Sequence, residues 1–188
     1  MGLTLANKIT IARFLFIPVL IVLIMQYAPG REYLRWWALG LYLFLEMTDV
    51  VDGYIARRFR QKTRAGSILD PLADKALFLS TLVCLYLVSH EFSWDVRMPL
   101  WLVVAFFARD VFLIAGGLIL EVKRGAIEIR PNLYGKMTAF LQVVCVTLVF
   151  LQWSAALLLW WFALGLTVIS TVIYMKEGIG VLNDDRDH

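Results

Sequence analysis

Long apolar stretches separated by short polar segments form the dominant pattern of this chain. A run of about 20 apolar residues is long enough to cross a bilayer as an α-helix. The pattern predicts six such spans: Arg13 to Tyr27, Leu34 to Ala56, Ile68 to Ser89, Met98 to Leu120, Met137 to Gln152 and Ala155 to Met175. We therefore expect an all-α integral membrane protein with six transmembrane helices.

Two of these spans are interrupted by acidic residues, near the end of the second and the start of the third. We expect both to continue as helices beyond the membrane. The first span has the position of a signal peptide, but no small-residue cleavage site follows it, so we expect it to be retained.

Composition supports a membrane environment. Apolar residues make up 61% of the chain, against roughly 45–50% in soluble domains. The length of 188 residues predicts one domain, residues 1–188, with the candidate active site within residues 49–74.

Basic residues are concentrated in alternate connections between the spans. They lie before the first span (Lys8, Arg13), after the second (Arg57 to Arg64), after the fourth (Lys123, Arg124, Arg130) and after the sixth (Lys176, Arg186). The remaining connections hold only Arg31, Arg35 and Arg97. The positive-inside rule then predicts that both termini and the acidic segment face the cytoplasm.

Four aspartates in the second and third spans follow a regular spacing: Asp49, Asp52, Asp70 and Asp74. Residues three or four apart share a helix face, so each pair forms a stripe on its own helix. A carboxylate at membrane depth is costly and indicates a function. Four carboxylates close together repel unless divalent cations hold them, and oxygen ligands suit Mg²⁺ or Mn²⁺. The spacing predicts a metal site between two facing helices.

Gly53 and Gly66 accompany the two acidic stripes. Glycine costs about 1 kcal/mol relative to alanine inside a helix, so these positions favour a flat ligand such as a nucleotide base, with helix packing as the alternative. Arg57 lies one turn beyond Gly53, where an arginine is suited to hold a substrate diphosphate. The other basic residues up to Arg64 are explained as a topology signal that also touches anionic headgroups.

Other kinds of site find no support. Cys84 and Cys145 both lie within predicted spans and are interpreted as packing residues. His90, in a predicted external loop, and the terminal His188 do not form a histidine metal site, and the chain has no P-loop. We expect no nucleic-acid partner.

The complete string D-x-x-D-G-x-x-A-R, eight residues, G-x-x-x-D-x-x-x-D runs from Asp49 to Asp74. It resembles the signature of the CDP-alcohol phosphotransferases, or CDP-alcohol phosphatidyltransferases. The segment from Asp70 to Lys75 is similar to the D-P-x-A-D-K of the family's glycerophospholipid synthases. The stretch from Asn7 to Arg13 resembles a short amphipathic helix that the family has at its N-terminus.

This resemblance implies transfer of the phosphatidyl group of CDP-diacylglycerol to an alcohol at the cytoplasmic face of the membrane, with release of CMP. It implies a homodimer and two ions, Mg²⁺ or Mn²⁺, bound by Asp49, Asp52, Asp70 and Asp74. Asp74 would also be the general base that takes the proton of the acceptor hydroxyl. The implied CDP-binding residues are Asp52, Gly53, Ala56, Arg57 and Gly66.

The acceptor depends on the second half of the chain, where Arg109 and Lys136 are candidate acceptor-binding residues. The alternative for these cations is pairing with Asp110 or snorkelling to headgroups. Phosphatidylglycerolphosphate synthases carry a further arginine where this chain has Gly117. The segment that begins at Arg109, R-D-V-F-L-I-A, is instead similar to the R-D-V-x-L-I-A of cardiolipin synthases.

These features favour phosphatidylglycerol as the acceptor, with glycerol 3-phosphate as the alternative. An inositol phosphate fits less well, and the roles of Arg124 and Arg130 stay open. A hypothesis from another class is a divalent-metal transporter, because carboxylates within a membrane also mark ion pathways. Its expected inverted repeat is not apparent in the sequence.

Overall fold

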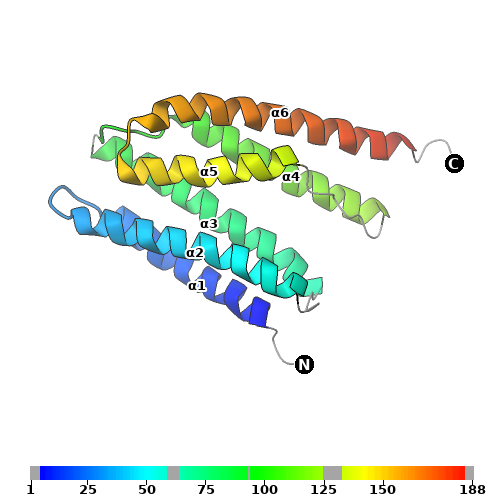
Figure 1. Ribbon diagram of the computed structural model, residues 1–188, viewed down its shortest axis with the longest axis horizontal. Coiled ribbons are helices and arrows are strands. Elements are labelled where there is room, and N and C mark those ends of the chain that lie inside the picture. Colours follow the sequence, from blue (N-terminus) through cyan, green and yellow to red (C-terminus); the bar gives the residue numbers. More distant parts are fainter. Residues whose placement is uncertain (1–4, 59–63, 93, 125–132, 185–188) are drawn as a thin grey trace. The chain divides into compact units, whose positions relative to one another are not determined.

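Each predicted apolar stretch forms the main part of an α-helix. The computed structural model describes the backbone of residues 5–58, 64–92, 94–124 and 133–184, and the side chains of residues 9–49, 69–92, 94–116 and 135–176. The helices of this described part are α1 (Leu5–Met25), α2 (Glu32–Arg58), α3 (Arg64–Glu91), α4 (Leu100–Arg124), α5 (Leu133–Leu151) and α6 (Ala155–Asp184) (Figure 1). The prediction of an all-helical protein is confirmed.

The helix ends differ from the ends of the predicted spans. As expected, α2 continues through the first half of the acidic motif to Arg58, and α3 begins at Arg64, before the second half. The stretch from Asn7 to Arg13 is the first part of a continuous α1 and not a separate short helix. His90 lies in the last turn of α3, so its placement in a loop was wrong. Apolarity marks where a helix meets lipid, whereas polar residues such as arginine and glutamate extend a helix readily.

Contacts divide the chain into two compact units, Met1–Arg97 with α1 to α3 and Met98–His188 with α4 to α6. In the first unit, α1 packs along both α2 and α3, while α2 and α3 contact each other at few positions. The start of α1, the end of α2 and the start of α3 share one end of this unit (Figure 1). Its fully buried core is formed by side chains of all three helices, among them Leu20, Ile24, Tyr42, Leu45, Leu77, Leu82 and Leu85.

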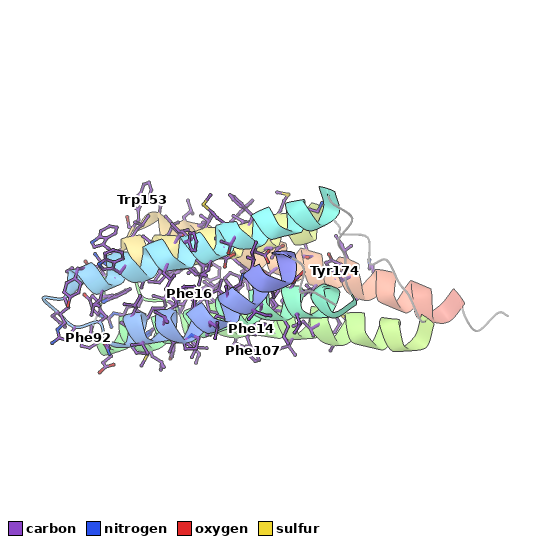
Figure 2. The ribbon with its side chains drawn as sticks, turned by 90° about the horizontal axis from the view of Figure 1, so that it is seen from below. Phe14, Phe16, Phe92, Phe107, Trp153 and Tyr174 are labelled. Carbon is purple, nitrogen blue, oxygen red and sulfur yellow. The ribbon has the colours of Figure 1, made fainter. Side chains whose placement is uncertain are left out.

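The opposite end of this unit is closed by an aromatic and ionic cluster. The ring of Tyr27 packs edge-on against Phe92, which Figure 2 shows at this end, and against Trp94 at 5.0 Å between centroids. The Tyr27 hydroxyl donates to Oε1 of Glu32 at 2.7 Å. The guanidinium of Arg35 lies 5.6 Å from the Trp94 ring centroid, within cation–π range. These contacts join the ends of three helices.

In the second unit, α6 packs against both α4 and α5. The indole rings of Trp101 on α4 and Trp161 on α6 stack at 5.1 Å. Gly135 on α5 lies directly against the ring of Tyr174 on α6. Cys145 is buried here and Cys84 is buried in the first unit, in agreement with their predicted role in packing.

Large apolar side chains are also exposed along the helices, with Leu158 exposed to 81% and Leu15 and Trp37 to 70% each. Figure 2 shows such side chains projecting from the ribbon, with Phe16 and Trp153 labelled. Within the described residues, two helical stretches are long and apolar enough to cross a membrane, Leu69–Glu91 and Ala155–Lys176. Two shorter apolar helical stretches, Ile9–Met25 and Gly135–Leu151, accompany them.

Candidate functional site

The two halves of the acidic motif lie on two helices. Asp49 is near the end of α2, and Asp70 and Asp74 are near the start of α3. The remaining motif positions are also helical, in α2 (Asp52, Gly53, Ala56, Arg57) and α3 (Gly66), and their side chains lie outside the described residues. The motif positions therefore lie on two helices, as the spacing predicts.

Asp49 pairs with an arginine of the first helix. Nη1 of Arg13 donates to Oδ1 of Asp49 at 2.6 Å. The Arg13 side chain is completely buried, whereas the Asp49 side chain is 34% exposed. A charge-assisted bond of this kind is short and strongly directional, so it fixes the orientation of the Asp49 carboxylate.

Asp70 is bound to the same helix. Oγ1 of Thr10, a buried side chain, donates to Oδ1 of Asp70 at 2.5 Å. A carboxylate has two oxygens, so a hydrogen bond to Oδ1 leaves Oδ2 as a possible ligand atom. The first helix thus holds one aspartate from each half of the motif.

Asp74 lies one helical turn beyond Asp70, with its side chain 30% exposed. Its Oδ2 is 3.7 Å from Nζ of Lys75, which also lies 5.9 Å from the ring centroid of Phe78. An ion pair of this length between partly exposed groups is weak. The carboxylate of Asp74 is thus partly exposed.

Glu46 is a further carboxylate that the motif does not include. It lies one turn before Asp49 on α2, and its Oε1 atom is buried. Asp74, Asp49 and Lys75 are close enough for their charges to act on it. The structure thus adds an acidic group one turn before Asp49 on α2, whereas Asp52 lies one turn after it.

The donor chemistry of this cluster fits a hard divalent cation, because all candidate ligand atoms are carboxylate oxygens. Two of the carboxylates are also about one-third exposed, so an ion can reach them. Among the residues with described side chains, no three His, Cys, Asp or Glu groups lie close enough together to hold a metal ion. Asp52, the fourth predicted ligand, is not among those residues.

The two predicted acceptor-binding residues differ in their surroundings. Arg109 is buried, and its Nη1 donates to Oδ1 of the fully buried Asp110 at 2.7 Å. Its Nη2 donates to the backbone carbonyl of Gly135 at 3.4 Å. Lys136, in contrast, is exposed. The pairing of Arg109 with Asp110 is the structural alternative that the sequence left open.

Three further positions were considered in relation to the acceptor: Arg124, Arg130 and Gly117. Arg124 is the last residue of α4, and Arg130 lies outside the described residues. Gly117 is helical in α4, in agreement with its predicted span.

Sequence reasoning missed the contacts of Thr10 and Arg13 with the motif and the position of Glu46 beside it. Arg13 was interpreted only as a topology charge, although it pairs with Asp49. The available signal was the spacing of Thr10 and Arg13, since two polar residues three apart on an apolar helix share one face. Glu46 lies at the same spacing before Asp49.

The chain is similar to one protein family and to several known enzymes. A family model described as CDP-alcohol phosphatidyltransferase matches residues 3–171. A CDP-diacylglycerol–glycerol-3-phosphate 3-phosphatidyltransferase of Aquifex aeolicus is 33% identical over 132 residues, which are 70% of this chain and 67% of that protein. The enzyme of the same name from Bacillus subtilis is 30% identical over 92% of this chain and 94% of its own length.

A relative with another name has a similar level of identity. A cardiolipin synthase (CMP-forming) of Streptomyces coelicolor is 33% identical over 138 residues, which are 73% of this chain and 60% of that protein. The match to the family model covers nearly the whole chain, and it includes the complete acidic motif. The chain therefore belongs to the CDP-alcohol phosphatidyltransferase family and is an enzyme of that family.

Proposed function

We propose that this protein is an integral membrane enzyme that transfers the phosphatidyl group of CDP-diacylglycerol to a glycerol-containing alcohol and releases CMP. The observation that carries this proposal is the attachment of Asp49 on α2 and Asp70 on α3 to the same helix, α1. Both halves of the acidic motif are thereby held at one end of a three-helix unit (Figure 1).

In this proposal Asp49, Asp52, Asp70 and Asp74 would hold two divalent cations, Mg²⁺ or Mn²⁺. When bound, these cations neutralise and orient the phosphates of the donor. Asp74 accepts the proton of the acceptor hydroxyl, and the hydroxyl oxygen forms a bond to the lipid-linked phosphorus. The bond from that phosphorus to the CMP oxygen breaks, and CMP leaves with its electron pair. The product phosphodiester stays in the bilayer.

The donor nucleotide would be bound by the motif positions between the aspartates. Gly53, Ala56 and Gly66 are small, so a flat cytidine ring can approach the helix backbone. Arg57 lies one turn beyond Gly53 on α2 and would hold the diphosphate, together with Asp52 and the cations.

The proposal places six helices across the cytoplasmic membrane, with both termini and the acidic motif on the cytoplasmic side. The exposed apolar side chains support it, since a soluble monomer seldom exposes large apolar patches. The aromatic cluster around Tyr27 and Trp94 lies at the end of its unit away from the motif, and aromatic residues are typical of membrane interfaces. The proposal keeps residues 1–188 as one domain and includes the homodimer that the family resemblance implies.

We further propose phosphatidylglycerol as the acceptor, as in a cardiolipin synthase. Asp110 already neutralises Arg109, and this arginine is therefore poorly suited to hold a phosphomonoester. Phosphatidylglycerol presents a free glycerol that needs no such clamp. Lys136 remains available for the acceptor's phosphodiester. Glycerol 3-phosphate is the second candidate, because the relatives from Aquifex aeolicus and Bacillus subtilis carry that acceptor in their names.

The test is an assay of the purified protein with CDP-diacylglycerol and Mg²⁺ or Mn²⁺. Phosphatidylglycerol, glycerol 3-phosphate, an inositol phosphate and serine are offered separately. We expect CMP release and formation of cardiolipin with phosphatidylglycerol, and release that is slower by about 100-fold or more in the Asp74→Asn variant. A lipid product formed from glycerol 3-phosphate instead would overturn the choice of phosphatidylglycerol as acceptor. If no alcohol gives CMP release, the enzyme proposal is overturned.

A further inference from the structure

One face of α1 carries two polar side chains that end on the acidic motif. Thr10 and Arg13 are three residues apart, and both are buried, as residues on the core face of a helix are. Thr10 binds Asp70 on α3, and Arg13 binds Asp49 on α2. A single helix face therefore contacts both halves of the motif.

This link is important because α2 and α3 contact each other at few positions, whereas α1 packs along both. Within the described residues, Asp49 and Asp70 are thus connected to each other through α1. A hydrogen bond to one oxygen of a carboxylate also fixes the direction in which the other oxygen points, as partners of metal ligands do.

We propose that Thr10 and Arg13 are positioning residues that hold Asp70 and Asp49 at the separation required by the metal site, and that Arg13 also balances the negative charge of the motif before cations bind. This inference rests on the proposed function, because Thr10 and Arg13 would position ligands of the proposed two-metal site. Neither residue needs to touch the substrate.

The two residues differ in charge, which separates their roles. The guanidinium of Arg13 is permanently positive, and it lies fully buried beside Asp49. Asp49 and Asp74 each lie close enough to Glu46 for their charges to act on it, and carboxylates held near one another repel when ionised. Thr10 is neutral and supplies orientation alone.

Thermal unfolding in detergent, with and without Mg²⁺, tests the charge of Arg13. The two cysteines of the chain, Cys84 and Cys145, are both buried, so a thiol-reactive fluorophore reports unfolding of the protein as it is. Without Mg²⁺ we expect Arg13→Met to lower the unfolding midpoint by about 6 °C or more. Mg²⁺ should remove most of this deficit. Arg13→Lys keeps the charge, and its smaller deficit should not depend on Mg²⁺.

A second variant covers the case in which Arg13→Met does not fold. Arg13→Met combined with Asp49→Asn removes both charges of the pair. We expect this double variant to be more stable without Mg²⁺ than Arg13→Met alone. If Arg13→Met yields no folded protein, a folded double variant supports the charge-balancing role in the same way. A double variant no more stable than the single one would contradict the charge-balancing role.

The response to Mg²⁺ concentration tests the position of Asp70. Thr10→Val removes the hydroxyl and should raise the half-saturating Mg²⁺ concentration by about tenfold or more. The shift should appear both in turnover and in the rise of the unfolding midpoint, and Thr10→Ser should reverse it. Ile11→Ala is the matched control, since Ile11 is an exposed neighbour on the same helix.

Each outcome decides a separate point. An Arg13→Met deficit that is equal with and without Mg²⁺ would overturn the role of Arg13, and an unchanged Mg²⁺ response of Thr10→Val would overturn that of Thr10. If the wild-type protein itself shows no response to Mg²⁺ or Mn²⁺ in turnover or midpoint, the proposed metal site fails, and this inference fails with it.

Discussion

The hydroxyl of Tyr174 on α6 occupies the space that a side chain at position 135 of α5 would need. A methyl group on Gly135 would lie 2.5 Å from that hydroxyl oxygen and 3.1 and 3.2 Å from two ring carbons, and Figure 2 labels Tyr174 on α6. Gly135→Ala should therefore force the ring to move and lower the stability by about 1–3 kcal/mol. Thermal unfolding in detergent measures the loss.

The control for this substitution is Gly40→Ala. Gly40 lies within α2, and a methyl group there would meet nothing within 4 Å. Helix propensity alone predicts a gain of about 0.5–1 kcal/mol at this position. Tyr174→Phe removes the closest atom and should recover part of the stability that Gly135→Ala loses. A Gly135→Ala protein as stable as Gly40→Ala would contradict the contact.

The buried pair of Arg109 and Asp110 leads to a second prediction. Asp110→Asn leaves the charge of Arg109 buried without its carboxylate, which should lower the stability by about 3–5 kcal/mol. Arg109→Met with Asp110→Leu removes both charges and should recover most of this loss. The Michaelis constant of that folded double variant for the acceptor then tests the binding role of Arg109. A constant equal to that of the wild-type protein would leave the arginine with a structural role only.

The division of labour between the aspartates leads to a third prediction. Asp74→Asn removes the proposed base, so turnover should fall by about 100-fold or more, while binding of CDP-diacylglycerol should be less affected than in Asp49→Asn. Equilibrium binding of the donor, measured beside CMP release, distinguishes the two variants. Equal losses of binding would show that the two aspartates act in the same way.

Arg57 and its neighbour Arg58 form a matched pair for a fourth prediction. If Arg57 holds the donor diphosphate, Arg57→Gln removes a charge-assisted contact and should raise the Michaelis constant for CDP-diacylglycerol by about tenfold or more. The constant for the acceptor should stay unchanged. Arg58→Gln, which removes the same charge one position later at the end of α2, should change the donor constant little. Similar effects of both substitutions would indicate a general electrostatic contribution.

Much of the fold was predictable because apolar runs and helical spacing are local properties. The acidic motif was expected on two helices, and Asp49, Asp70 and Asp74 do lie on α2 and α3. The helix ends were less predictable, since polar residues such as Arg58 and Arg124 continue a helix past the apolar stretch. Hydropathy carries no information on that point.

Contacts between distant residues were not predictable in the same way. Arg13 and Asp49 are separated by 36 residues, and the position of Arg13 before an apolar span is equally well explained by topology. Its partner follows only from how α1 packs against α2. For Arg109, in contrast, the sequence already offered its neighbour Asp110 as a partner beside an acceptor role, and the 2.7 Å distance between their side chains shows that the pair forms. Packing thus decides the partner of Arg13, whereas the partner of Arg109 was one of the alternatives that the sequence offered.

The attachment of Asp49 and Asp70 to α1 also has a consequence for biosynthesis. The partners described for these two aspartates, Arg13 and Thr10, all belong to the unit that ends at Arg97. The N-terminal part of a chain is synthesised first and can begin to fold before the rest. Asp49 and Asp70 can therefore acquire these contacts once the first three helices have left the ribosome, before α4 to α6 exist.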